Sequence, residues 1–286
     1  MKTLKSQVEE IKNIRGSKQS KINMLAKLGI TKYEIGLILN DSNATVKKTA
    51  TFGVEIECLV PRMAVTGRLE ANFVPFEYQG YNHTDSKTIY KFVSDSSIRG
   101  ENPIECVSPI LSGRKGFDSL AACLTSLNEA GATVNKSTGL HVHVGAEELT
   151  DEQYVNVFAN YKLLEEVIDS FMAKSRRAND SQWCASLRNH DFSDCTTIED
   201  VRRELRYSRY HKVNAESYER HKTIEFRQHQ GSTDFTKIKN WVNFCIKLVE
   251  WSKDNRLTEQ VRSIDEIPFL NKAEKRFFNK RAEALR

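Results

Sequence analysis

The sequence predicts an α+β fold, in which a curved, largely antiparallel sheet is backed by helices and a small helical arm stands at the amino terminus. Three observations predict it. Short segments of alternating polar and apolar residues, the pattern of half-buried strands, are scattered along the chain. Helical periodicities follow closely behind several of them. No internal repeat or low-complexity tract interrupts this mixture.

Composition is that of an ordinary soluble globular protein. The chain has 286 residues, of which 39% are hydrophobic and 28% are charged. No apolar run approaches the roughly 20 residues that span a bilayer. The first residues lack the apolar core of a secretory signal, so we expect a cytoplasmic protein. The six cysteines include no C-x-x-C pair, which predicts reduced and mostly buried thiols.

The positive charge is concentrated in the first part of the chain. Residues 1–49 hold ten Lys or Arg and four Asp or Glu, a difference of +6, whereas the remainder holds 33 and 34, a difference of −1. We therefore predict two domains, a basic arm over residues 1–49 and a nearly neutral catalytic domain over residues 50–286.

Helices are expected in the arm at 3–14, 18–28, 31–39 and 43–48. The stretch "KLGITKYEIGLILNDSNATVKK" resembles a helix-turn-helix, with a glycine-containing turn, "T-x-x-E-I" and "S-x-x-T-V" within residues 29–46. DNA contact is one interpretation of this arm. A helical cap or an oligomerisation arm is the other, because a basic helix face is usually only solvated.

The elements of the second domain follow from the same patterns. Strands are expected at 51–60, 88–93, 103–107, 139–145 and 223–229. Helices are expected at 114–131, 151–173, 199–207, 235–251 and 271–285. Loop-like sequence fills 62–86 and 175–198.

Charged side chains recur at alternate positions of the strands. In "GVEIEC", Glu55 and Glu57 face the same way, and two adjacent carboxylates repel each other unless a cation lies between them. Mg²⁺ is the natural partner of such oxygen ligands. Two solvated acids are the alternative. Glu105 lies inside an apolar strand, and Asp95 lies near the end of the preceding one.

Two further strands carry nitrogen ligands and an arginine. In "GLHVHVG", His141 and His143 share a face, which is a metal or phosphate signal. In "TIEFRQH", Glu225, Arg227 and His229 alternate with apolar or amide residues. The planar guanidinium of Arg227 suits phosphate or carboxylate.

If these strands share one sheet, their polar faces line a single concave surface and their apolar faces meet the helices. That surface would suit divalent metals and a polyphosphate. The sequence has no G-x-x-x-x-G-K-[ST] and no kinase motif set, so neither of those phosphate sites is expected.

Six segments, in this order, resemble the amidoligase family, which is related to glutamine synthetase and glutamate–cysteine ligase. They are "FGVEIE", "DSSIRGENPIECVSPIL", "GLHVHVG", "SRRANDSQWC", "RYHKVNAES" and "TIEFRQHQGSTDFTKIKNWVNF", within about residues 50–255. The family usually has a glycine or similar small residue near Asp95, where this chain reads "SDSSIRG", and "GT" where it reads "GSTD".

The resemblance implies a sheet of the glutamine-synthetase type and ATP-dependent formation of an amide or peptide-like bond through an acyl phosphate. Its implied metal ligands for Mg²⁺ are Glu55, Glu57, Glu105, His143 and Glu225. Its implied nucleotide contacts are His141, His143, Arg176, Asn179 and Arg227. Its implied catalytic residues are Glu57, Arg177 and Arg227.

Two other residues, Lys212 and Asn214, either reach the site or belong to a surface strand. The expected partners are carboxylate and amine substrates, free or within a peptide, with nucleic acid as a possible partner of residues 1–49 and no membrane. Two other functions stay open: a nucleic-acid-associated protein with a silent body, and a metal-dependent hydrolase that uses His141 and His143. The sequence does not name the acid, the amine or the oligomeric state.

Overall fold

The computed structural model describes residues 4–13, 18–28, 50–80, 86 and 88–286. The chain divides into two compact units, residues 1–49 and residues 50–286. The first unit contains helices α1 (Leu4–Asn13) and α2 (Lys18–Lys27), with Val8 and Leu25 buried. The predicted helices at 31–39 and 43–48, and almost all of the helix-turn-helix-like stretch, lie outside the described residues.

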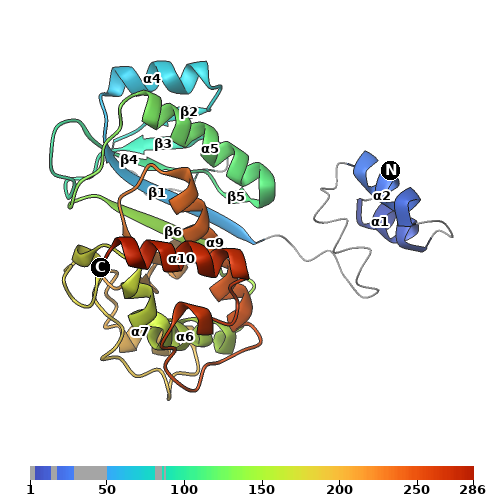
Figure 1. Ribbon diagram of the computed structural model, residues 1–286, viewed down its shortest axis with the longest axis vertical. Helices are drawn as coiled ribbons and strands as arrows, with labels where there is room; N and C mark the ends of the chain where they lie inside the picture. Colours follow the sequence, from blue (N-terminus) through green and yellow to red (C-terminus); the bar gives the residue numbers. More distant parts are fainter. Residues whose placement is uncertain (1–3, 14–17, 29–49, 81–85, 87) are drawn as a thin grey trace. The chain divides into compact units, whose positions relative to one another are not determined.

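The second unit is built on one sheet (Figure 1). Its strands run in the order β2-β3-β4-β1-β6-β8-β7, and β5 pairs with β1; only β2 and β3 are parallel to each other. Their bounds are β1 Thr51–Leu59, β2 Phe76–Tyr78, β3 Tyr90–Val93, β4 Pro103–Val107, β5 Leu111–Ser112, β6 Gly139–Gly145, β7 Val213–Asn214 and β8 Thr223–Gln230. The predicted α+β class with a largely antiparallel sheet is confirmed.

The second unit also contains helices of varied length. Their bounds are α4 Arg62–Ala71, α5 Gly113–Glu129, α6 Asp151–Ser170, α7 Ile198–Glu204, α8 Ser217–His221, α9 Phe235–Ser252 and α10 Lys272–Ala284, with short 3-10 helices η1 Lys174–Arg176 and η2 Ile264–Glu266. No helix of the described ranges is both long and apolar enough to cross a bilayer.

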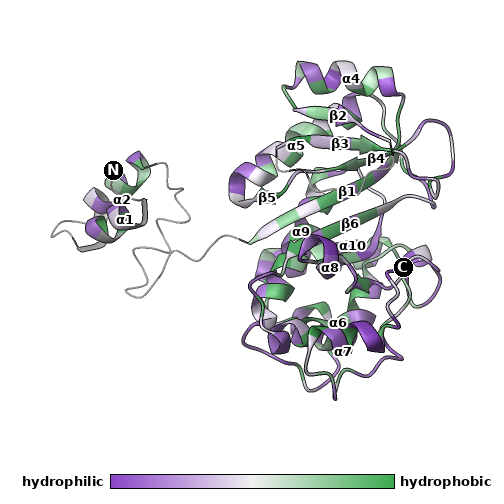
Figure 2. Ribbon diagram, turned by 180° about the vertical axis from the view of Figure 1, so that it is seen from behind, coloured by the Kyte–Doolittle hydropathy of each residue, from purple (hydrophilic) through white to green (hydrophobic). Residues whose placement is uncertain are grey.

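One face of the sheet packs against α5, α6 and α9. Alternation in β1 directs Val54, Ile56 and Cys58 into this core, where each is at most 1% exposed. Aromatic contacts join sheet to helices: Phe52 in β1 stacks on Phe117 of α5, with ring centroids 4.8 Å apart. Apolar residues accordingly colour much of the central strands (Figure 2).

The prediction of a loop over residues 62–86 is wrong for about half of this stretch. Residues 62–71 form α4, and residues 76–78 form the edge strand β2. Only two residues of α4, Val65 and Leu69, are buried. They lie one helical turn apart, and so short an apolar stripe gives little periodicity to detect in a polar sequence.

The cysteines are all unpaired, and five of the six are buried. Cys58, Cys106 and Cys245 lie in the core cluster beneath the sheet. Burial raises the pKa of the Cys58 thiol to about 12, so this group is not a thiolate at neutral pH.

Candidate active site

The face of the sheet opposite the core helices carries the charged residues that the sequence singled out. Residues paired directly across neighbouring strands lie on the same face. The register pairs Glu57 in β1 with Glu105 in β4, Glu55 in β1 with His141 in β6, and His143 in β6 with Glu225 in β8. Four strands, contributed by segments far apart in the sequence, thus place these side chains together.

Glu55 lies between the two imidazoles. Its Oε2 is 2.9 Å from Nδ1 of His141, and its Oε1 is 3.3 Å from Nε2 of His143. Burial opposes ionisation of this carboxyl, but the two imidazoles outweigh burial and hold the pKa of Glu55 well below its ordinary value. Glu55 is therefore a carboxylate at neutral pH.

His143 presents one ring nitrogen to the acids. Its Nδ1 is 2.9 Å from Oγ1 of Thr223, which fixes the ring orientation. Its Nε2 is buried without a hydrogen-bond partner and lies 4.0 Å from Oε1 of Glu225. Burial disfavours its charged form, yet the nearby carboxylates, Glu55 first, raise the pKa of His143. Because a metal binds the unprotonated ring nitrogen, a cation at Nε2 would compete with a proton for this atom.

Glu225 is held by two donors. Its Oε1 accepts a hydrogen bond from the Arg227 guanidinium, and its Oε2 accepts one of 2.5 Å from the Asn214 amide in β7. Burial raises the pKa of Glu225, but the charge of Arg227 together with His143 lowers it below the ordinary value. Arg227 also reaches the carbonyl of Trp183, 3.4 Å from its Nε, so a loop residue lies over this end of the site.

At the other end of the site, Gly139 lies close to a second arginine, Arg176. The N–H of Gly139 donates a 2.6 Å hydrogen bond to Oε2 of Glu57. A Cβ at Gly139 would lie 3.0 Å from Nε2 of His141 and 3.4 Å from both terminal nitrogens of Arg176. Arg176 is 5% exposed and donates to the carbonyl of Thr138 at 2.7 Å. The glycine therefore allows imidazole and guanidinium to approach the same point of the backbone.

The ligand atoms are close enough to share cations. Three groups each place one donor atom per residue within 4.8 Å of the others: Glu55, His143 and Glu225; Glu55, Glu105 and His141; and Glu57, Asp95 and Glu105. Such oxygen-rich groups are the ligands that Mg²⁺ and Mn²⁺ prefer. Nε2 of His143 is buried, makes no hydrogen bond and lies 3.3 Å from Glu55, so it fits a cation in the first group.

Glu105 shows the electrostatic cost of this arrangement. It is 8% exposed and directly opposes Glu57. Burial and the neighbouring carboxylates, Glu55 first among them, raise the pKa of Glu105 well above its ordinary value. A divalent cation beside this carboxyl would remove that repulsion.

Two residues that the sequence predicted for the site, Arg177 and Asn179, hydrogen-bond to main-chain groups instead. Arg177 donates from Nε to the carbonyl of Met172 and from Nη2 to the carbonyl of Leu285, both at 2.9 Å. Asn179 accepts a 2.8 Å hydrogen bond from the N–H of Ser186. Both side chains thus link separate segments of the main chain by hydrogen bonds.

His229 was expected on the charged face, and that expectation is wrong. A bulge between β6 and β8 places three steps of β8, from Phe226 to His229, against two steps of β6, from Val142 to Leu140. An extra residue reverses the alternation, so His229 turns toward the helices. Its ring lies 5.8 Å from that of Trp241 in α9.

Lys212 neither reaches the site nor lies on a surface strand, which were the two alternatives that the sequence left open. Its side chain is fully buried, and Nζ lies 2.8 Å from Glu165 and 2.6 Å from Asp169, both on α6. Asn214, its neighbour two residues on, does reach the site through Glu225.

Two further residues of this face, Lys91 and Thr223, were not expected from the sequence. Lys91 pairs with Val107, which in turn pairs with Glu55, so it lies on the charged face and is only 3% exposed. The available sign in the sequence was that Lys91 lies between two aromatic residues, Tyr90 and Phe92, which are buried in the core. A lysine that alternates with core residues points to the opposite face of the sheet. Nothing in the sequence distinguished Thr223 from any other strand threonine.

The fold and this face place the chain among α+β proteins whose open sheet bears a carboxylate and imidazole cluster flanked by arginines. A family model described as "Putative amidoligase enzyme" matches residues 48–249, more than half of the chain. The chain therefore belongs to this amidoligase family, which the resemblance of its motifs predicted. A search of curated proteins found no match.

Proposed function

We propose that this protein is an ATP- and Mg²⁺-dependent ligase that joins a carboxylate to an amine through an acyl phosphate. One observation carries the proposal: carboxylates, imidazoles and two arginines from distant segments converge on one sheet face. They are Glu55, Glu57, Glu105, His141, His143, Arg176, Glu225 and Arg227. Membership of the amidoligase family supports amide-bond formation as the reaction.

The acids are the proposed metal ligands. Glu55, His143 and Glu225 would hold one Mg²⁺, and Glu57, Asp95 and Glu105 would hold a second. A divalent cation held by these residues would supply positive charge to offset that of the ATP phosphates. His141, between Glu55 and Glu57, would keep the two groups of ligands oriented.

The chemistry explains why cations and arginines are needed together. A carboxylate is a poor electrophile, so its oxygen first attacks the γ-phosphorus of ATP and the bond to ADP breaks. The amine nitrogen then attacks the acyl carbon, the bond to phosphate breaks, and the amine loses a proton. Charge accumulates on the phosphoryl group in the first step, where Arg227 and Arg176 would stabilise it. The loop that carries Trp183 would limit water, which otherwise hydrolyses the acyl phosphate.

The test is release of ADP with a panel of carboxylates and amines in the presence of Mg²⁺. We expect turnover that requires both substrates and the metal, and a loss of at least about 100-fold in Glu225→Gln. Glu219→Gln is the matched control, because Glu219 pairs with Arg202 on the surface. Hydrolysis of ATP that no carboxylate and amine pair stimulates, or turnover that persists without divalent metal, would contradict the proposal.

A further inference from the structure

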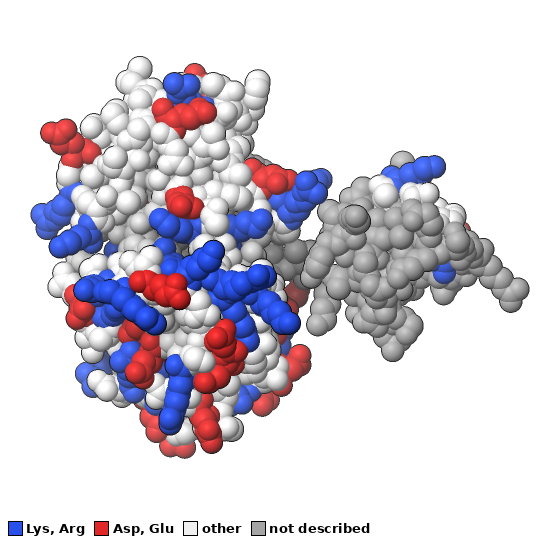
Figure 3. All heavy atoms as spheres, in the orientation of Figure 1, with Lys and Arg blue, Asp and Glu red and all other residues white. Residues whose placement is uncertain are grey.

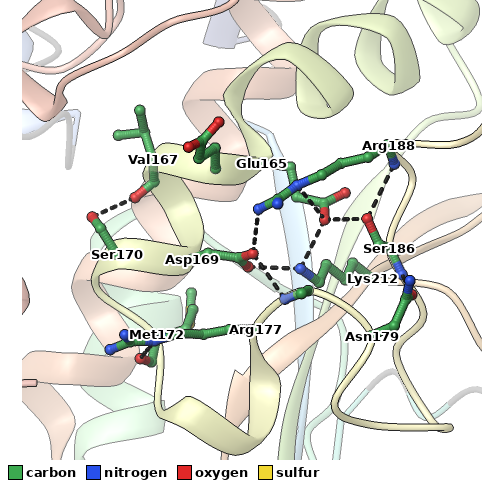
Figure 4. A network of polar contacts seen from close by, with 12 residues as sticks. Glu165, Val167, Asp169, Ser170, Met172, Arg177, Asn179, Ser186, Arg188 and Lys212 are labelled. Atoms are coloured by element: carbon green, nitrogen blue, oxygen red, sulfur yellow. Dashed lines mark hydrogen bonds and ion pairs between the residues drawn. The ribbon is translucent and has the colours of Figure 1, made fainter.

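A second charged network lies on the core side of β8, away from the carboxylates of the site. Glu165 and Asp169 are one helical turn apart on α6, and Lys212 and Arg188 point toward both of them (Figure 4). Nζ of Lys212 is 2.6 Å from Oδ1 of Asp169, and Nη2 of Arg188 is 2.6 Å from its Oδ2. Two acids and two bases balance each other's charge.

The network fastens one loop to α6. Glu165 accepts a 2.5 Å hydrogen bond from the Ser186 hydroxyl and a 2.7 Å bond from the N–H of Leu187. Asp169 accepts a 2.9 Å bond from the N–H of Ala178, a non-glycine residue with a φ of 42°. Because the left-handed region is unfavourable for a residue with a Cβ, the hydrogen bond to Asp169 helps to hold Ala178 in a conformation that it would not prefer by itself.

The same network reaches the main chain of both site arginines. The Gln228 amide donates to Oδ1 of Asp169 and also, at 3.1 Å, to the carbonyl of Arg176. The N–H of Arg227 donates a 2.8 Å hydrogen bond to the carbonyl of Lys212. The main chain of Arg176 is thus linked to the network through Gln228, and the main chain of Arg227 is bonded directly to that of Lys212.

Stability alone is a poor reason for burying the charges of Glu165, Asp169 and Lys212, whereas Arg188 is partly exposed. Apolar residues of similar volume often replace a buried ion pair without loss of stability, because two charges must leave water to form it. A network with defined donor directions does fix geometry, which apolar packing does less well.

We propose that Glu165, Asp169, Lys212 and Arg188 form a positioning network that holds Arg176 and Arg227 in register with the transferring phosphoryl group. The inference rests on the proposed function for the identity of that group. The four residues touch no reacting atom; they act through the loop at 174–190 and through Gln228.

The double variant Asp169→Asn with Lys212→Met tests this, since it removes one acid and one base and leaves no unmatched buried charge. Lys247→Met with Glu274→Gln is the matched control, because that 2.6 Å pair joins α9 to α10. We expect the test variant to keep its affinity for Mn²⁺, whose ligands lie on the other face, and to keep its KM for MgATP. Its kcat should fall about 100-fold, the scale of a 1 Å misplacement. The control should change neither constant.

Hydrogen exchange supplies a readout that does not depend on turnover. The amides of Arg227 and of residues 174–190 should exchange faster in the test variant than in the control. An unchanged kcat in an active enzyme, or unchanged exchange at these amides, would overturn the positioning role. Absence of turnover in the unmodified protein would instead contradict the proposed function, and exchange would then decide the positioning role by itself.

Discussion

At the residue scale, the site depends on one position without a side chain. Gly139 gives its N–H to Glu57, and the space beside its Cα is used by His141 and Arg176. The sequence showed the glycine only as the boundary of a strand. Its role becomes clear when β1, β6 and the loop carrying Arg176 are brought together.

Gly139→Ala should therefore weaken the site without unfolding the protein. The new methyl group would lie 3.0 Å from Nε2 of His141 and 3.4 Å from the guanidinium of Arg176, so one of the two must move. We expect Mn²⁺ affinity, measured by electron paramagnetic resonance, to fall about 10- to 100-fold. Gly67→Ala in α4 is the control, since nothing lies within 4 Å of its added carbon. Equal affinities in the two variants would contradict the assigned role.

His229 makes stability depend on pH. Burial lowers its pKa from an ordinary value of 6.5 to about 3. Between these values the unfolded chain binds a proton that the folded chain does not, so the free energy of unfolding falls as pH drops below 6.5. One such group contributes a slope of up to about 1.4 kcal/mol per pH unit.

His229→Gln removes this titration. Denaturant unfolding at pH 7 and pH 5 should show a smaller loss of stability on acidification in the variant than in the unmodified protein. The variant can be less stable at pH 7, because the contact with Trp241 changes, without affecting this comparison. Identical losses in the two proteins would show that His229 is not buried in its neutral form.

The residues that sequence reasoning located correctly share one property. Glu55, Glu57, His141 and His143 lie in regular strands, where alternation alone fixes the face. His229 follows a bulge, and Arg177 lies in a loop, where neither face nor direction follows from spacing. The face of the sheet on which a side chain lies could therefore be predicted only within a regular strand.

At the scale of elements, α6 connects the core to the network beneath the site. Its first turn is closed by a capping box, in which Thr150 accepts from the N–H of Gln153 and the Gln153 side chain accepts from the N–H of Thr150. The sequence predicted this start correctly. The end at Ser170, rather than at 173, reflects the turn that leads into η1.

Thr150→Ala should lower stability by about 1 kcal/mol, because one helix N–H loses its acceptor. Ser112→Ala is the control, since Ser112 precedes α5 but its side chain makes no capping hydrogen bond. Urea unfolding measures both. A cost for Ser112→Ala as large as that for Thr150→Ala would show that the loss does not come from the cap.

At the scale of the whole molecule, charge divides as the two units do. The first 49 residues carry an excess of +6, and the remainder is close to neutral. On the face seen in Figure 3, Lys and Arg side chains of the second unit are interspersed with Asp and Glu. Mixed charge of this kind gives that face no uniform field for a polyanion.

A chain that begins at residue 48 should consequently fold and act by itself. The family match starts there, and β1 starts at Thr51. We expect the same thermal midpoint and the same MgATP turnover as for the full chain, with any salt-sensitive retention of DNA confined to the full chain. Loss of cooperative unfolding in the shortened chain would show that residues 1–47 stabilise the second unit.

The sequence by itself determined the α+β class, most elements and the set of acids and imidazoles, because alternation and helical periodicity are local properties of the backbone. Only the tertiary structure decided which side chains meet. The register across β4, β1, β6 and β8, the bulge that turns His229 away and the burial of Lys212 depend on contacts between residues far apart in the chain. Local sequence patterns do not specify which distant residues come into contact.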